Sequence, residues 1–126
     1  MNEFADELHD IFERFGRITL RRMFGGQGVF HDGRMFGLIA DGQLYLKADA
    51  SSVAFFEARG LKSFEYQYQP QGKTVRLSYY EAPPEVFEDR HEAAIWAGRA
   101  WEAVLRAGPP KPKRRVGQRA PMTDER

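Results

Sequence analysis

Three histidines, one glycine-rich loop and one serine are the residues of this chain whose types could take part in chemistry. The loop at residues 25–28 has the sequence GGQG, and successive backbone N–H groups in such a loop can bind an anion. A phosphate-binding loop leads into a helix N-terminus, however, whereas the pattern after Gly28 predicts a strand. We therefore interpret the loop as a bend at which two strands approach closely.

The histidines and the serine form no catalytic or metal-binding pattern. His9, His31 and His91 are far apart, and no two of them have the short spacing typical of metal ligands. Ser78 is not part of the G-x-S-x-G motif of hydrolases. The chain has no cysteine, which excludes disulfides, thiol catalysis and cysteine-bound metals. We therefore predict no catalytic, metal-binding or cofactor-binding residue and expect that the protein is not an enzyme.

Charge is distributed unevenly along the chain, although the net charge is only +1. Residues 1–107 hold 13 basic and 16 acidic side chains, whereas residues 108–126 hold six basic and two acidic ones. Four of these cations lie close together in the sequence: Lys111, Lys113, Arg114 and Arg115. Such a cluster could bind nucleic-acid phosphates weakly and without sequence preference, and it could equally be a solubilising terminus. The sequence leaves both interpretations open.

The length of 126 residues is that of one domain, since most domains contain about 100–150 residues. We expect an ordered domain at residues 1–108 and a disordered, proline-rich basic tail at residues 109–126. No window approaches the roughly 18 apolar residues of a membrane span, and the acidic N-terminus is unlike a secretory signal. These features predict a soluble, cytoplasmic protein without membrane contact.

Hydrophobic spacing predicts an α+β protein in which groups of strands alternate with single helices. We expect two layers, with an antiparallel sheet of five to six strands and helices on one of its faces. The order of elements is α-β(3-4)-α-β(2)-α. The expected helices are residues 2–16, 48–60 and 89–107, and the expected strands are residues 17–24, a three-stranded meander ending at residue 47, and residues 64–69 and 74–80.

Each expected helix has one apolar side, which would cover the sheet. These sides contain Phe4, Leu8, Ile11, Phe12 and Phe15 in the first helix, Val53, Ala54 and Phe56 in the second, and Ile95, Trp101, Val104 and Leu105 in the last. Asp89 and Glu92 have the spacing of a capping box and indicate where the last helix begins.

Two Asp-Gly pairs, at residues 32–33 and 41–42, predict two-residue turns between the strands of the meander. Counting outward from each turn gives the pairing: Phe30 with Met35, Val29 with Phe36, Ile39 with Leu44, and Leu38 with Tyr45. One side of the meander is then apolar and must be covered, and it contains Phe30, Met35, Ile39, Leu44 and Leu46.

The opposite side of the meander combines apolar, aromatic and polar residues, namely Val29, His31, Arg34, Phe36, Leu38, Gln43, Tyr45 and Lys47. Such a side is too apolar for ordinary surface and too charged for a core, so we interpret it as a partner-binding face. The candidate contact residues are Arg34, Phe36, Leu38, Tyr45 and Lys47. The partner would be another protein or a second copy of this chain in a homodimer.

Several motifs, in this order, resemble those of the TfoX N-terminal domain family. They are Arg22-Met23-Phe24-Gly25-Gly26 with Gly28, Asp32-Gly33 with Met35-Phe36, Leu44-Tyr45-Leu46-Lys47, and Leu77-Ser78-Tyr79-Tyr80-Glu81 with Pro83. The resemblance covers about residues 1–107. It implies a small α+β domain, similar in layout to secretion chaperones, in bacterial proteins that regulate competence for DNA uptake. It carries over no catalytic residue and no cofactor.

Longer members of that family are positive regulators of DNA-uptake genes alongside a cyclic-AMP receptor protein, and they have a second, C-terminal domain. In this sequence a basic tail follows Gly108, so we expect a stand-alone N-terminal domain. The leading hypothesis is a non-enzymatic regulatory or adaptor domain that acts on transcription and competence through protein–protein contacts. The alternative is a DNA-associated protein that binds the phosphate backbone weakly and non-specifically through its tail.

Overall fold

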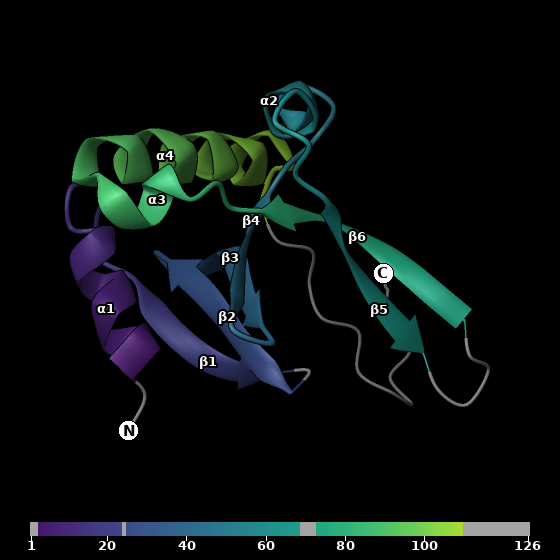
Figure 1. The fold of residues 1–126 in the computed structure, drawn as a ribbon, viewed down its shortest axis with the longest axis horizontal. Coiled ribbons are helices and arrows are strands. Elements are labelled where there is room, and N and C mark those ends of the chain that lie inside the picture. Colours follow the sequence, from purple (N-terminus) through teal and green to yellow (C-terminus); the bar gives the residue numbers. More distant parts are fainter. Residues whose placement is uncertain (1–2, 24, 69–72, 110–126) are drawn as a thin grey trace, which may run out of the picture.

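The computed structural model describes residues 3–23, 25–68 and 73–109 and confirms the expected α+β fold. Six antiparallel strands form an open sheet in the order β1-β2-β3-β4-β6-β5, and helices cover one of its faces (Figure 1). In chain order the elements are α1 (Glu3–Ile11), β1 (Thr19–Met23), β2 (Gly26–His31), β3 (Arg34–Ala40), β4 (Gln43–Lys47), α2 (Val53–Glu57), β5 (Ser63–Tyr68), β6 (Lys73–Glu81), α3 (Glu85–Glu88) and α4 (Arg90–Arg106).

Both Asp-Gly pairs form the predicted two-residue turns. Asp32 and Gly33 have φ angles of 50° and 77°, and Asp41 and Gly42 have φ angles of 51° and 74°. Two consecutive positive φ angles are those of a type I′ turn, whose twist matches that of the flanking strands. The second hairpin therefore has the predicted register, with Leu38 opposite Tyr45 and Ile39 opposite Leu44.

The first hairpin departs from the predicted register at one position. Phe30 lies opposite Met35 as predicted, but Val29 lies opposite Gly37, so Phe36 is an extra residue in β3. This is a β-bulge, in which two residues of one strand oppose one residue of the other. Gly37 has no side chain at the point where an added Cβ would lie 3.0 Å from the carbonyl oxygen of Tyr45.

The bulge exchanges the two sides of the first hairpin, because side chains alternate along a strand. The predicted placement of Phe30 and Met35 under the helices is therefore wrong, as is the predicted placement of Val29, His31, Arg34 and Phe36 on the uncovered side. Phe30 is instead flanked by Arg21, and Met35 and Met23 are its neighbours around Gly28. We call this uncovered side the helix-free face, and it contains Arg21, Met23, Phe30, Met35, Leu38, Tyr45, Lys47, Phe64 and Tyr79.

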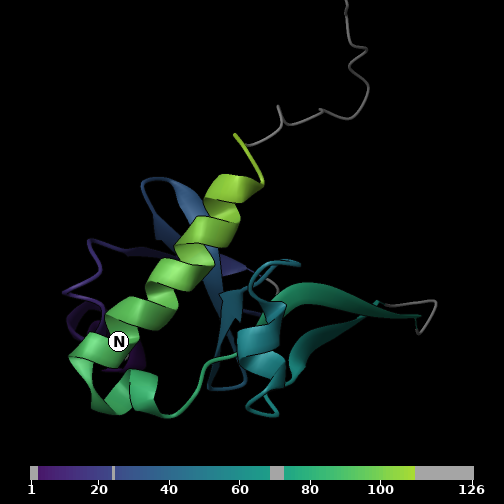
Figure 2. The same cartoon turned by 90° about the horizontal axis from the view of Figure 1, so that it is seen from above.

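Phe36 lies at the centre of the core that the bulge creates. Its ring is fully buried and lies 5.8 Å from the ring of Phe12, 5.1 Å from that of Phe15 and 6.5 Å from that of Trp101. Val29 is also fully buried. The aromatic rings therefore join the sheet to α4 and to the turn that follows α1, and α4 lies diagonally across the molecule above them (Figure 2).

The apolar side of the first helix is confirmed, since Leu8, Ile11 and Phe12 are buried. The helix itself ends at Ile11, and residues 12–15 form a turn rather than the predicted continuation to residue 16. The second helix, α2, lies inside the predicted segment, with Phe56 buried and Ala54 exposed.

The start of α4 is confirmed, but part of its predicted inner side is wrong. The side chain of Asp89 accepts hydrogen bonds from the backbone N–H groups of His91 and Glu92, at 2.8 and 3.4 Å. Ile95 and Leu105 are exposed, at 37% and 52%. The buried side instead consists of Ala93, Trp96, Ala97, Ala100, Ala103 and Val104. Small alanine side chains let the helix axis approach the sheet closely, which turns the larger Ile95 and Leu105 outward.

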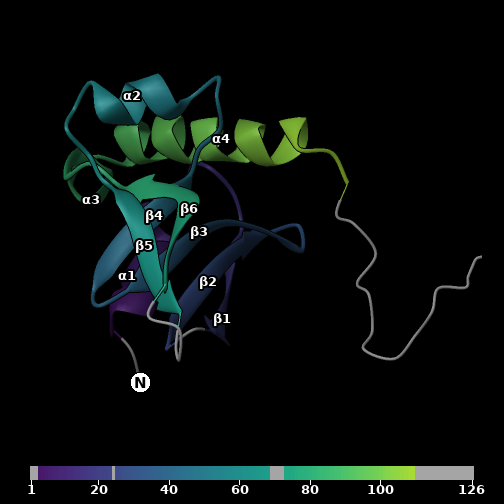
Figure 3. The same cartoon turned by 90° about the vertical axis from the view of Figure 1, so that its right-hand side faces the viewer.

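Strands β5 and β6 form a ribbon that projects from the rest of the sheet in Figure 1 and lies nearest the viewer in Figure 3. The ladder of β6 with β4 consists of Tyr45–Lys47 opposite Tyr79–Glu81, and the backbone N–H of Ala48 donates to the carbonyl oxygen of Ser78. The preceding part of β6 is paired with β5. The predicted turn at residues 70–72 lies outside the described residues.

Candidate functional site

The histidines and acidic side chains of the described residues form no metal-binding cluster. Among residues 3–23, 25–68 and 73–109, no three His, Asp or Glu side chains are placed to hold a metal ion. His31 packs against the rings of Phe15 and Trp101, each with a centroid distance of 4.7 Å. Its Nδ1 atom lies 2.7 Å from the carbonyl oxygen of Arg17. The imidazole thus joins the loop after α1, the end of β2 and the helix α4.

The five residues predicted to bind a partner do not lie on one surface of the protein. Phe36 belongs to the core, and Leu38 is on the helix-free face but only 4% exposed. Tyr45 and Lys47 lie beside Leu38 and are half-buried. Of the five predicted contact residues, only Tyr45 and Lys47 therefore offer accessible surface on a shared face of the sheet.

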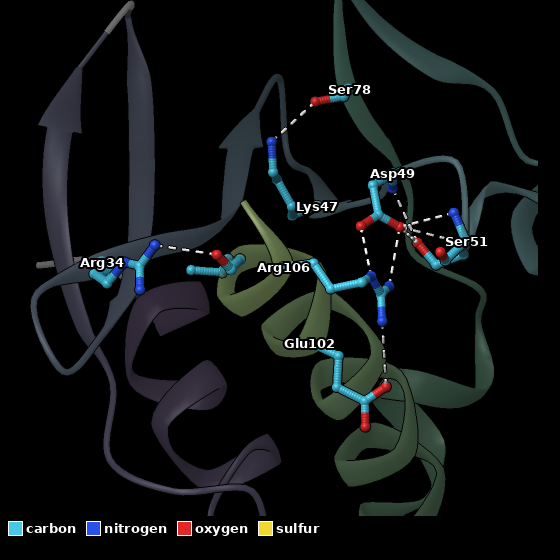
Figure 4. A network of polar contacts seen from close by, with 9 residues as sticks. Arg34, Lys47, Asp49, Ser51, Ser78, Glu102 and Arg106 are labelled. Carbon is cyan, nitrogen blue, oxygen red and sulfur yellow. Dashed lines mark hydrogen bonds and ion pairs between the residues drawn. The ribbon is translucent and has the colours of Figure 1, made fainter. Parts of the chain in front are cut away.

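Arg34 has a structural role on the helix side instead. Its guanidinium donates a hydrogen bond of 3.0 Å to the carbonyl oxygen of Val104 and another to the carbonyl oxygen of Gly108. Figure 4 shows the Arg34 side chain directed toward the end of α4. The last carbonyl groups of a helix have no partner within the helix, and they carry the negative end of its dipole. Arg34 thus caps α4 from the β2–β3 hairpin, a contact that the sequence pattern did not indicate.

Aromatic rings, a lysine and the carboxylate of Glu81 lie on the helix-free face near β4 and β6. The rings of Tyr45 and Phe64 are 5.0 Å apart at their centroids. The Nζ atom of Lys47 lies 5.5 Å from the ring centroid of Tyr79 and donates a hydrogen bond of 3.1 Å to the hydroxyl of Ser78. Burial raises the pKa of Tyr79 to about 12. Burial, followed by the nearby carboxylates of Glu81 and Asp41, also raises the pKa of Tyr45, so both phenols stay protonated and uncharged at neutral pH.

The other half of the helix-free face includes Phe30 and Met35, which were predicted to lie on the covered side. The guanidinium of Arg21 lies 5.0 Å from the ring centroid of Phe30, as in a cation–π pair. Met23 and Met35 are half-buried beside it. The signal that could have placed Phe30 and Met35 on this face is Gly37, since an isolated glycine within a strand pattern is typical of a bulge.

The glycine-rich loop lies beside a shallow hollow of about 650 Å³, among whose lining residues are Phe4, Arg22, Gly26 and Asp41. A Cβ atom at Gly26 would lie 2.0 Å from the carbonyl oxygen of Ile39. The close approach of the two strands therefore requires glycine at position 26, as predicted for this loop. The hollow is open to solvent and holds cationic and anionic side chains together, which gives it no clear preference for an anion.

An ion pair joins the segment after β4 to the last turn of α4. The guanidinium of Arg106 donates two hydrogen bonds to the carboxylate of Asp49, at 2.7 and 2.9 Å (Figure 4). The same carboxylate accepts hydrogen bonds from the backbone N–H groups of Ser51 and Ser52. The hydrogen bonds from Arg106, which outweigh the effect of burial, lower the pKa of Asp49 to about 2.

The ion pair between Asp49 and Arg106 should make the stability of the folded protein depend on pH. The pKa of Asp49 is lower in the folded protein, about 2, than in the unfolded chain, about 3.9. The carboxylate therefore stabilises the fold fully above about pH 5, and this contribution is lost as the pH falls through the folded pKa. In chemical unfolding between about pH 5 and pH 2, wild type should lose more stability than the Asp49→Asn variant. Glu102→Gln, which removes a contact of 4.0 Å to Arg106, is the control and should follow wild type.

The predicted nucleic-acid contacts, Lys111, Lys113, Arg114 and Arg115, lie outside the described residues, as does nearly all of the predicted tail. Within the described part of the chain, no helix combines the length and the apolar character needed to cross a lipid bilayer.

Comparison with known proteins identifies the family. The model of the TfoX N-terminal domain matches residues 10–104. A curated relative, DNA transformation protein TfoX1 of Aliivibrio fischeri (strain ATCC 700601 / ES114), is 31% identical over 90 residues. These residues are 71% of this chain and 42% of the relative, so the match spans less than half of that protein. The chain belongs to the TfoX N-terminal domain family.

Proposed function

We propose that this protein is a regulatory domain of DNA transformation that acts by binding another protein through the helix-free face. The observation that carries the proposal is the half-exposed aromatic pair of Tyr45 and Phe64, with Lys47 beside it, on the side of the sheet opposite the helices. Family membership supports the regulatory part, because the curated relative is named for DNA transformation. The function does not require a catalytic residue.

The packing of the helix-free face supports a role in binding. Three side chains of this face are at most 9% exposed and are therefore fixed by packing: Phe30, Leu38 and Tyr79. Tyr45 is the cross-strand neighbour of Leu38, its ring packs against that of Phe64, and both rings keep part of their surface in solvent. Rigid aromatic side chains that are held in place lose little conformational entropy when a partner covers them, which favours their use at protein interfaces. The partner would present apolar side chains to this pair.

Tyr45→Lys tests this proposal in a bacterial strain whose DNA uptake depends on the protein. We expect the variant to lose most of the transformation frequency, because a lysine in place of the ring places a charge within the apolar contact. The midpoint of thermal unfolding should change little, since Tyr45 is only half-buried. Transformation frequency, protein level and thermal unfolding are measured for the same strain.

Phe55→Lys is the matched control on the helical side. Phe55 is 46% exposed on α2, so the substitution also replaces a partly exposed aromatic ring with lysine, but on the helical side of the protein. The control should keep wild-type transformation. Wild-type transformation by a folded Tyr45→Lys variant would contradict the proposed face. DNA binding through the tail is the alternative mechanism, and it rests on the sequence of residues 111–115 alone.

A further inference from the structure

Strand β1 forms one outer edge of the sheet, and β5 forms the other (Figure 1). Among the described residues, the backbone of β1 pairs only with β2, and no backbone hydrogen bond joins β1 to another segment. In an antiparallel pair, every second residue exchanges hydrogen bonds with the neighbouring strand, so the residues between them direct their N–H and carbonyl groups outward. The outer edge of β1 therefore has backbone donors and acceptors that a further strand could use.

Exposed arginines surround this edge. Arg17 comes just before β1, Arg21 and Arg22 lie within it, and all three are exposed. In the part of the chain that the structure describes, arginines near the helices form ion pairs with acidic side chains, whereas none of these three does. The positive charge of these arginines therefore lies along one edge of a domain whose residues 1–107 hold more acidic than basic side chains.

The two arginines within β1 lie on opposite faces of the sheet, because side chains alternate along a strand. Arg21 is on the helix-free face, where its guanidinium lies 5.0 Å from the ring centroid of Phe30. Arg22 is on the same face as Leu20, which packs against the core. A strand added along β1 would therefore meet one cation on each of its two faces, at successive positions.

We propose that the outer edge of β1 binds an extended acidic segment of a partner protein, which adds to the sheet as a further antiparallel strand. Two successive acidic residues of that segment lie opposite Arg21 and Arg22. Directly opposite side chains of neighbouring strands have Cβ atoms about 4.5–5.5 Å apart, so each carboxylate can accept hydrogen bonds from one guanidinium. This edge is separate from the pair of Tyr45 and Phe64, so the proposal does not rest on the proposed function.

Two other occupants fit this edge less well. A second copy of β1, paired about Arg21, would place arginine opposite arginine, and like charges in that position are destabilising. Nucleic-acid phosphates would also bind arginine, but a phosphate backbone that follows one face of the sheet would reach only one of Arg21 and Arg22. Phosphates would also leave the outward carbonyl groups of β1 without a donor. An acidic strand satisfies the cations and the backbone groups together.

Binding of short labelled peptides tests the charge. The peptide VTEEVT has two acidic residues between strand-forming ones, and VTQQVT and VTKKVT differ from it only in that central pair. Fluorescence polarisation should show that wild type binds VTEEVT, binds VTQQVT about tenfold more weakly, and does not bind VTKKVT. The double variant Arg21→Glu/Arg22→Glu should reverse this order and bind VTKKVT best, and circular dichroism checks that it is folded.

Arg59→Gln is the matched control, since it removes an exposed arginine just after α2 that is paired with Glu85. This control should keep the wild-type order of the three peptides. Tyr45→Lys should also bind VTEEVT as wild type does, which separates this test from that of the helix-free face. Equal binding of the three peptides by wild type, or an unchanged order in the double arginine variant, would overturn the proposal.

Backbone methylation separates strand pairing from attraction between charges alone. N-methyl groups on alternate residues of VTEEVT remove backbone N–H donors and keep both acidic side chains. Alternate residues of a strand direct their N–H groups to the same edge, so methylation of one set should abolish binding and methylation of the other set should leave it nearly unchanged. Equal effects of the two sets would overturn the added strand. Displacement of VTEEVT by an equimolar oligothymidylate would assign the arginines to nucleic acid and would also overturn the proposal.

Discussion

Replacing Phe36 with alanine should lower the free energy of unfolding by about 3–5 kcal/mol. The ring is fully buried and packs against Phe12, Phe15 and Trp101, so its removal leaves a cavity among aromatic rings. The free energy of unfolding of a domain is typically about 5–15 kcal/mol, so the substitution would remove a large part of the total stability. Urea unfolding followed by tryptophan fluorescence measures the change, because Trp101 is one of the neighbours.

Phe55→Ala is the control for this prediction. It removes the same ring from a position that is 46% exposed, where the ring lies 3.8 Å from the guanidinium carbon of Arg99. We expect a loss of about 1 kcal/mol or less, the usual size of an exposed cation–π contact. If Phe36→Ala were as mild as Phe55→Ala, the ring would not be in the core and the bulge in β3 would be wrong.

Gly26→Ala should destabilise the protein by about 3 kcal/mol or more. The new Cβ atom would lie 2.0 Å from the carbonyl oxygen of Ile39, which belongs to the backbone of the neighbouring strand. A backbone atom cannot rotate away as a flexible side chain can, so β2 and β3 would have to separate near the β3–β4 turn. Thermal unfolding and amide hydrogen exchange of β2 and β3 measure the effect.

Gly98→Ala is the control, and it should change the stability in the opposite direction. Gly98 lies within α4, and apart from its chain neighbours and the adjoining backbone of the helix no atom lies within 4 Å of a Cβ built at this position. Alanine in a helix is more favourable than glycine by roughly 0.5–1 kcal/mol, so this variant should be more stable than wild type. A Gly26→Ala variant with wild-type stability would show that the two strands are not in close contact.

The sequence was sufficient to predict the second hairpin and the order of elements apart from the short helix α3, and it failed at one residue of the first hairpin. Both turns depend on the local chemistry of Asp-Gly, which determines the turn type without help from the rest of the fold. The bulge at Phe36 depends on packing between distant segments, since the ring is buried by residues of α4 and of the turn after α1. Counting outward from a turn cannot detect such a contact.

The face of α4 could be predicted only in part for a related reason. The apolar residues Ile95 and Leu105 suggested an inner side, but alanines at positions 93, 97, 100 and 103 form it. Alanine is apolar and also the best helix former, so its presence does not distinguish a buried side from an exposed one. Arg34 is a similar case, because its bonds to Val104 and Gly108 join residues 70 or more positions apart.

The bulge also constrains how relatives of this chain should be compared. Because Phe36 is the extra residue of the bulge, deleting it would leave Phe30 opposite Met35 and Val29 opposite Gly37, and the other side chains would keep their present sides of the sheet. The deletion would remove only the ring that packs against Phe12, Phe15 and Trp101. An alignment with a gap of one residue at position 36 therefore describes a relative with a regular first hairpin and a smaller core. Such relatives should carry a larger apolar side chain at a neighbouring position, which fills the space that the ring occupies here.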